Sequence, residues 1–313
     1  MIQIAGIIAP IFGVMAVGYL AVRVGLFGAV TARRLVLFVF NAAIPIMLFY
    51  RIATIDFPEE IAWSFLGGYY ASAFAAYGLG MLSARFLFQR PIDEQSIYGL
   101  GAGFSNTVLL GIPLLVSAFG DEATVPIFLI ISFHSATLLP VSIILIETGR
   151  GREGQAASMR AARLVFEVVA NPIIAGILLG LGANLAGLST LPAPIDAVGR
   201  VMATVAIPCS LLALGASLAG YRLEGQLAPA SVLAGIKLLV QPMLAWVLVV
   251  PVLGLGWPWA PVAVVMAGLP SAAMVYLFGA RYETASEVAA SAVVLSSAFS
   301  VVTLSVLLVL MGA

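Results

Sequence analysis

The sequence has very little charge for its length. Asp, Glu, Lys and Arg make up 9% of its 313 residues, against about 25% in soluble domains, while 62% of the residues are hydrophobic. A chain of this composition cannot cover a water-facing surface, so we expect an all-α integral membrane protein. The formal net charge is zero, so no basic face points to nucleic acid.

Cysteine and histidine each occur once, as Cys209 and His134. One cysteine excludes a disulfide within the chain, and two such residues are too few for a zinc cluster. The sequence contains no HExxH or GxxxxGK[ST] motif, and no carboxylate pair lies plainly in mid-membrane. We therefore expect no enzyme, no metal site and no cofactor. An intramembrane hydrolase and a passive channel are the alternatives from other classes; turnover of labelled lipid or peptide, or flux that does not saturate, would favour them.

Ten apolar segments are long enough to span a bilayer, which takes roughly 20 residues of helix. They lie near residues 3–23, 34–53, 61–86, 96–118, 124–146, 161–183, 196–219, 228–254, 258–280 and 285–311. The N-terminus has no basic region and no cleavage pattern, so we expect its first segment to be a membrane helix rather than a signal peptide.

Basic residues set the expected orientation. The odd-numbered loops hold eleven of the 14 Lys and Arg residues, whereas the even-numbered loops hold only Arg51 and Arg200. The positive-inside rule then places the odd loops in the cytoplasm and both termini outside. The polar stretch from Glu147 to Arg163 divides the spans five and five, and we favour a solvated cytoplasmic linker over a regulatory site. The expected units are residues 1–148, a linker at 149–160, and residues 161–313.

The two halves share landmarks in the same order. These are Pro10 and Gly18 with Pro172 and Gly180, AIP at 43–45 with AIP at 206–208, and GIP at 111–113 with GLP at 268–270, each of the last two followed by Phe-Gly. Because each half holds five spans, the second half enters the membrane in the opposite orientation. An inverted repeat of this kind is typical of secondary transporters.

Glycine and proline interrupt two corresponding spans, the fourth at Gly111 and Pro113 and the ninth at Gly268 and Pro270. Proline removes a backbone donor, and lipid cannot satisfy the carbonyl that it frees, so a break is tolerated where it lines a cavity. The half-helix after each break would direct N–H groups and a positive dipole end at one cavity. That arrangement favours an anion.

Polar residues near these interruptions are the candidate substrate ligands. They are Asn41, Ser105, Asn106, Thr107, His134, Ser210 and Ser271. Each could instead bond a neighbouring helix; we favour ligand contact for Asn106, whereas the structural role is at least as good for Ser105, Thr107 and Ser210. His134 could receive substrate, carry a proton, or stay neutral against a backbone carbonyl.

Two further ionisable residues lie within spans. Lys237 could counter a substrate charge or reach toward the cytoplasmic face, and we favour the structural role. Glu167 is shallower, and we expect its side chain to extend to the membrane surface.

Four motifs make the chain resemble the auxin efflux carrier family, which includes the plant auxin exporters and bacterial malonate-type carriers. They are SNTVLLGIPLL at 105–115, NPIIAGILLG at 171–180, IPCSLLALGASL at 207–218 and LPSAAMVYLFGARYETASEVAASAVVLSS at 269–297. Asn106 stands seven residues before Pro113, as in the family's fourth-helix motif. The resemblance covers the whole chain, although the plant exporters have a long loop between the halves that is short here.

The resemblance implies ten transmembrane helices in two inverted five-helix repeats. Helices 1, 2, 6 and 7 would form a scaffold, and helices 3–5 and 8–10 a transport domain in which broken helices 4 and 9 cross beside the substrate. It implies a homodimer in a bacterial cytoplasmic (inner) membrane that moves a small organic anion, such as malonate, another dicarboxylate or an auxin-like acid, by elevator-type alternating access. Coupling to H⁺ or Na⁺ stays open, and a sodium-coupled organic-anion symporter of the bile-acid carrier type is the alternative.

Overall fold

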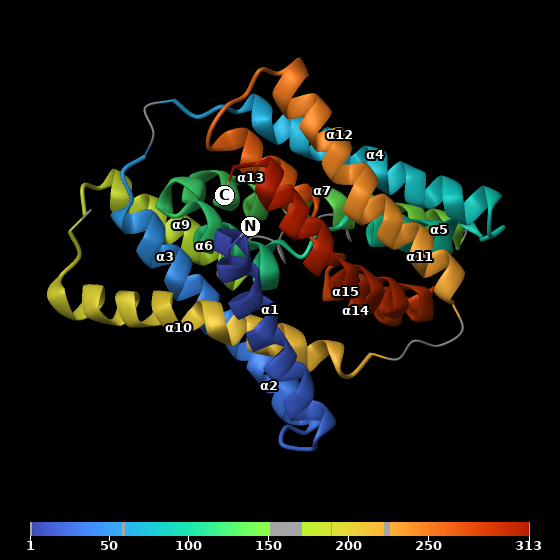
Figure 1. The fold of residues 1–313 in the computed structure, drawn as a ribbon, viewed down its shortest axis with the longest axis horizontal. Helices are drawn as coiled ribbons and strands as arrows, with labels where there is room; N and C mark the ends of the chain where they lie inside the picture. Colours follow the sequence, from blue (N-terminus) through green and yellow to red (C-terminus); the bar gives the residue numbers. More distant parts are fainter. Residues whose placement is uncertain (1, 58–59, 151–170, 189, 222–225, 313) are drawn as a thin grey trace.

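The protein is helical throughout the residues that the computed structural model describes, which are 2–57, 60–150, 171–188, 190–221 and 226–312 (Figure 1). The helices are α1 (Ile2–Arg23), α2 (Ala29–Phe38), η1 (Val39–Ala43), α3 (Ile44–Thr54), α4 (Ser64–Phe86), α5 (Ile92–Gly103), η2 (Thr107–Gly111), α6 (Ile112–Phe119), η3 (Asp121–Ala123), α7 (Thr124–Gly149), α9 (Pro172–Leu185), α10 (Ala193–Leu218), α11 (Leu227–Gly235), η4 (Ile236–Val240), α12 (Gln241–Val247), η5 (Leu248–Val252), α13 (Trp259–Ala267), α14 (Ala273–Arg281) and α15 (Ser286–Leu310). Most of the expected linker, the start of the sixth segment and Glu167 lie outside the described residues.

Six helical stretches in the described part are long and apolar enough to cross a membrane. They are Ile4–Arg23, Ala29–Thr54, Asp121–Gly149, Ala193–Leu218, Leu227–Val252 and Ser286–Leu310. These coincide with the first, second, fifth, seventh, eighth and tenth predicted segments. The third corresponds to α4, and the fourth and ninth are the interrupted pairs α5–α6 and α13–α14. The expectation of an all-α integral membrane protein is therefore confirmed.

The expected break at Pro113 is wrong. The helix is continuous from Thr107 through Pro113 to Phe119, and it is interrupted seven residues earlier, at Phe104–Asn106. Proline is tolerated here because the π-helical turn η2 comes directly before it, and a widened turn moves the carbonyl with which the ring would clash. Pro45 is likewise the second residue after η1, and Pro242 is the second residue after η4, so a π-helical turn precedes a proline at three places in the chain.

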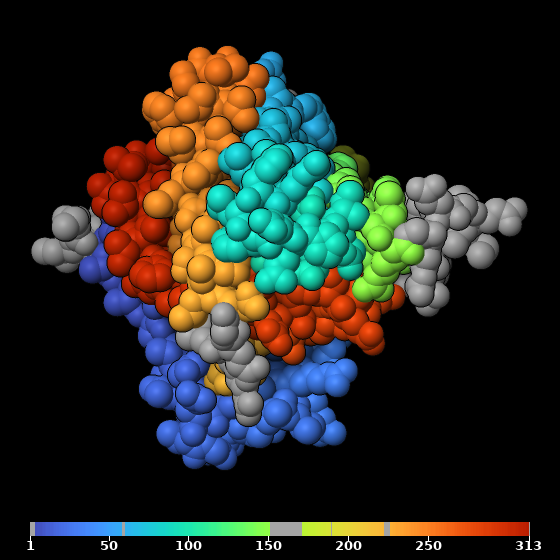
Figure 2. All heavy atoms as spheres, turned by 90° about the vertical axis from the view of Figure 1, so that its right-hand side faces the viewer, coloured from blue at the N-terminus to red at the C-terminus, as the bar shows by residue number. Residues whose placement is uncertain are grey.

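The helices divide into two groups in Figure 1. The first, which we call the α1/α10 group, contains α1, α2, α3, α9 and α10 at the left and bottom of the view. The second, the α4/α15 group, contains α4–α7 and α11–α15, and Figure 2 shows its face with α4 and α11 side by side. The groups meet where α1 and α10 pack on α6 and where α1 packs on α15.

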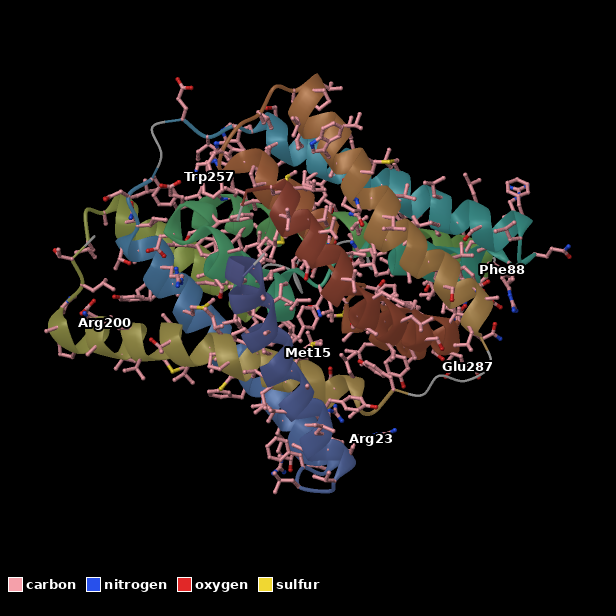
Figure 3. The ribbon with its side chains drawn as sticks, in the orientation of Figure 1. Met15, Arg23, Phe88, Arg200, Trp257 and Glu287 are labelled. Carbon is pink, nitrogen blue, oxygen red and sulfur yellow. The ribbon has the colours of Figure 1, made fainter. Side chains whose placement is uncertain are left out.

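Glycines allow two close helix contacts inside the α1/α10 group. A Cβ at Gly18 of α1 would lie 2.2 Å from the Leu212 carbonyl oxygen on α10, and one at Gly180 of α9 would lie 2.7 Å from the Phe49 oxygen on α3. Gly18 and Gly180 are corresponding landmarks of the repeat. Each half therefore contributes a helix that packs through its landmark glycine on a helix of the other half. Figure 3 labels Met15 where α1 crosses α10.

Candidate functional site

Two short extended stretches, at residues 104–106 and 270–272, interrupt the helices and pair with each other. Ser105 and Ser271 form an antiparallel β-bridge. The Asn106 N–H donates to the Pro270 oxygen at 2.9 Å, and the Ala272 N–H donates to the Phe104 oxygen at 3.2 Å. These bonds satisfy backbone groups that the helix ends leave without intrahelical partners. The interrupted helices are thus joined through main chain, and we call this pairing the junction.

The two central residues of the junction each direct an N–H group at a side chain. The Ser105 N–H donates to Nε2 of His134 on α7 at 3.0 Å, and the Ser271 N–H donates to Oγ of Ser296 on α15 at 3.0 Å. α7 corresponds to the fifth predicted span and α15 to the tenth. The predicted fifth and tenth spans therefore each supply one acceptor to the junction. His134 is bonded to a backbone N–H, and not to the carbonyl that we expected for its structural role.

His134 is in one defined protonation state in this arrangement. Because Nε2 accepts a hydrogen bond from Ser105, that nitrogen carries no proton, and the neutral ring carries its proton on Nδ1. Nδ1 is buried and has no hydrogen-bond partner among the described residues, and the whole residue is 2% exposed. The ring stacks near Phe104, with the centroids 4.4 Å apart. A buried donor is thereby held in fixed orientation without an acceptor.

Asn106 is the second buried donor of the junction. Its residue is 4% exposed, and its Nδ2 has no partner in the described part of the chain. Its backbone oxygen accepts from Gly111 N–H at 3.0 Å and its backbone N–H is bonded to Pro270, so only the side chain is left available. The hydroxyl groups of Ser105 and Tyr69 are neighbours in this region, but they do not form a hydrogen bond with each other. The junction thus offers donors to a ligand and no carboxylate of its own.

Lys237 adds a buried amine donor to this region. It is fully buried on η4, where its Nζ donates to the Ala267 oxygen at 2.6 Å and to Gln241 Oε1 at 2.7 Å. Ala267 is the last residue of α13, so the ammonium group meets the negative end of a half-helix at the break. The expectation that Lys237 reaches toward the cytoplasmic face is wrong, because the break supplies a carbonyl inside the protein.

The remaining predicted residues of the crossing hold the two segments together. Ser271 Oγ donates to the Gly101 oxygen at 2.5 Å, and the Thr107 N–H donates to the Ser105 oxygen at 2.9 Å. A Cβ at Gly111 would lie 2.7 Å from Leu269, and one at Gly268 would lie 2.2 Å from a Leu307 methyl carbon. These glycines therefore allow the segments and α15 to approach closely.

Two predicted ligands have other surroundings. Ser210 is buried on α10, and its hydroxyl donates to the Ile207 oxygen of its own helix at 2.7 Å. Asn41 is exposed on η1 and makes no side-chain hydrogen bond with a described residue. Neither side chain is linked to the junction by a hydrogen bond. Ser296 and Tyr69 were missed by the sequence reasoning; for Ser296, the only available signal was its place in the tenth span, opposite His134 in the fifth.

Comparison with known proteins fits this architecture. The family described as "Membrane transport protein" matches residues 4–308. A protein of Rhizobium meliloti (strain 1021) named "Putative malonate transporter" is 26% identical over 314 aligned residues, which cover 99% of this chain and 96% of that protein. An "Uncharacterized transporter" of Methanothermobacter thermautotrophicus is 26% identical over 92% of this chain and 91% of its own length.

A third match is partial. The "Lysosomal cholesterol signaling protein" of Mus musculus is 26% identical over 185 residues, which cover 55% of this chain but 21% of the mouse protein. The family match, in contrast, covers nearly the whole chain, as does the malonate-transporter similarity. The chain is therefore a membrane transporter that belongs to the membrane transport protein family, the family of the auxin efflux carriers that its motifs resemble.

Proposed function

We propose that this protein is a secondary active transporter of a small carboxylate, which binds beside Asn106 at the junction. The observation that carries the proposal is the pair of buried donors, Asn106 Nδ2 and His134 Nδ1, which have no partner among the described residues. An unsatisfied buried donor costs about 1–3 kcal/mol, and a bound carboxylate would remove that cost. The name of the Rhizobium relative makes malonate the first substrate to test.

An anion suits the junction better than a cation. The described polar groups there are amide, imidazole and hydroxyl donors, and the buried Lys237 amine donates to the Ala267 oxygen, three residues before Pro270. Low dielectric strengthens each of these interactions, because the site is walled by Phe104 and by Tyr69, whose ring centroid lies 6.0 Å from that of His134. A dicarboxylate such as malonate could place one carboxylate against each donor.

Elevator-type alternating access is supported by the division of the helices into two groups. In this proposal the α1/α10 group is the scaffold, and the α4/α15 group carries the junction across the membrane. The equivalent contacts of Gly18 and Gly180, and of His134 and Ser296, are what ten spans in two inverted repeats would produce. The excess of Lys and Arg in odd loops supports the orientation with both termini outside, in a bacterial inner membrane.

The assembly we propose is a homodimer formed through the α1/α10 group. Large apolar side chains are exposed along α1 and α10, including Val17, Leu20, Val198 and Val201. Mass measurement of the protein in a mild detergent should give two copies per particle, and a mass of one copy would contradict it.

Uptake into proteoliposomes tests the proposed function. Radiolabelled malonate should accumulate with saturable kinetics, and an excess of unlabelled carboxylate should compete. Asn106→Ala should reduce uptake at least tenfold without loss of folded protein, because it deletes a donor that only the ligand uses. Ser305→Ala is the matched control, since that hydroxyl donates to the Val301 oxygen of its own helix.

Ion gradients imposed in the same assay decide the coupling. Uptake that follows a pH gradient with sodium absent would identify a proton-coupled carrier, and uptake that requires sodium would identify the bile-acid carrier type of mechanism. If Asn106→Ala and the wild type transport every tested carboxylate equally, the junction is not the binding site. Flux that rises linearly with concentration would show a passive pore.

A further inference from the structure

A cavity of about 770 Å³ opens between α3, α10 and the turn at η3, away from the junction. It is lined by Tyr50, Arg51, Thr54, Ile55, Asp56, Asp121, Glu122, Thr124, Arg200, Ala203, Thr204, Ile207 and Pro208. Arg51 and Arg200 are the two basic residues that the sequence assigns to the outer loops, and both line this one cavity. Figure 3 labels Arg200 on α10, at the left of the view.

One donor atom of Arg51 has no hydrogen-bond partner among the described residues. Its Nη1 bonds Asp121 Oδ1 at 2.6 Å, but its Nε is buried and has no partner among the described residues. The arginine side chain is 19% exposed, whereas that of Asp121 is 83% exposed. A guanidinium group binds carboxylates best through two parallel N–H groups, and Asp121 uses only one atom of the fork. The Nε edge is therefore not used by Asp121.

Thr124 supplies a second unpartnered group in the cavity wall. It is 1% exposed, and its Oγ1 is buried without a hydrogen-bond partner in the described chain. The wall thus combines a guanidinium edge with a hydroxyl that has no partner among the described residues.

The acidic residues around the cavity are mostly engaged. Asp121 binds Arg51, Glu122 accepts from Nε1 of Trp257, and Asp196 accepts from both Arg200 and the Tyr50 hydroxyl. Asp121 and Asp196 are each paired with an arginine and Glu122 with a neutral indole N–H, and none of these three carboxylates bonds Nε of Arg51. The cavity suits a small carboxylate rather than a polyanion, because Asp56 and Glu122 also face it.

We propose that this cavity is an outer waiting site, where a carboxylate binds Arg51 Nε and Thr124 Oγ1 before it moves to the junction. The substrate class rests on the proposed function. Thr124 and His134 are ten residues apart on α7, a distance of roughly 15 Å along a helix, so one helix connects the two sites. A carboxylate held at Arg51 is concentrated at the end of that helix.

The test separates the waiting site from the junction by removing the junction contact first. Purified Asn106→Ala protein is titrated with malonate by calorimetry, together with the double variants that add Arg51→Gln or Arg51→Lys. We expect Asn106→Ala to keep one weak malonate site, and both substitutions at Arg51 to weaken it at least tenfold. The lysine variant keeps the positive charge but lacks the Nε edge. It therefore tests the same contact if the glutamine variant does not fold. Arg85→Gln, on α4 away from this cavity, is the matched control and should change nothing.

Three results would overturn the waiting site. They are no malonate binding to Asn106→Ala protein, binding unchanged by either substitution at Arg51, and equal, Arg51-dependent binding of inorganic phosphate, which would show a general anion site. A different result would show that the junction is not the substrate site. In that case Asn106→Ala protein would transport malonate like the wild type, and the substitutions at Arg51 would still report on malonate binding in the cavity.

Discussion

The Ser105 N–H donates to Nε2 of His134, and this one bond fixes both the backbone at the break and the proton on the imidazole ring. The same bond turns His134 Nδ1–H toward a site without an acceptor. We therefore propose two separable roles for His134, an acceptor for the protein and a donor for the ligand.

Substitutions at His134 should separate these roles. His134→Leu leaves the Ser105 N–H unpaired in the interior, so we expect about 1–3 kcal/mol of destabilisation and a lower apparent Tm in detergent. His134→Gln supplies an acceptor oxygen, and should recover most of that stability while malonate uptake stays at least tenfold reduced. Full uptake by His134→Gln would show that Nδ1 does not contact the substrate.

Ser296 accepts from the Ser271 N–H as His134 accepts from the Ser105 N–H, and it tests the acceptor role alone. Ser296→Ala leaves the Ser271 N–H without its partner at 3.0 Å, so we expect a loss of about 1–3 kcal/mol. Ser300→Ala is the control, because that hydroxyl donates only to the Ser297 oxygen of its own helix. Thermal unfolding of the two variants in the same detergent makes the comparison. Equal melting temperatures would mean that the second acceptor contributes nothing.

Lys237 should matter more for anion binding than for stability. Lys237→Met removes two hydrogen bonds, but it also removes the cost of burying an ammonium group, so these effects partly cancel. We expect the apparent Tm to change little and the malonate Kd to rise about tenfold, or about 1.4 kcal/mol, because the buried amine beside the Ala267 oxygen at the break is lost. Lys237→Arg keeps the charge and should retain most of the affinity. An unchanged malonate Kd in the methionine variant would show that Lys237 does not contribute to anion binding.

The sequence predicted that the fourth and ninth spans are interrupted and meet. Asn106 lies in an apolar span that contains glycine and proline, and the order of landmarks in the two halves relates that span to the one that contains Pro270. The position of the break was misjudged because proline can follow a π-helical turn without ending a helix, as Pro113 does.

The partners of the junction could not be read in the same way. Ser296 accepts from a main-chain N–H that only the tertiary pairing of residues 104–106 with 270–272 brings into place. The direction of Lys237 depends on the Ala267 carbonyl, which is freed by a break 30 residues further along the chain. Serine is common in membrane helices, so its occurrence carried no signal by itself.

The tightest contact between α1 and α10 offers a prediction about the α1/α10 group. A Cβ at Gly215 would lie 1.8 Å from the Met15 carbonyl oxygen, which is backbone and cannot rotate away. Gly215→Ala should therefore separate the helices and lower stability by about 1–3 kcal/mol, the usual cost of overpacking. Gly13→Ala on α1 is the matched control, because nothing lies within 4 Å of its added carbon. Alanine loses less conformational entropy than glycine on forming a helix, so this variant should be neutral or about 0.5–1 kcal/mol more stable. Apparent Tm in detergent measures both; a Gly215→Ala variant as stable as Gly13→Ala would show that α1 and α10 do not approach this closely.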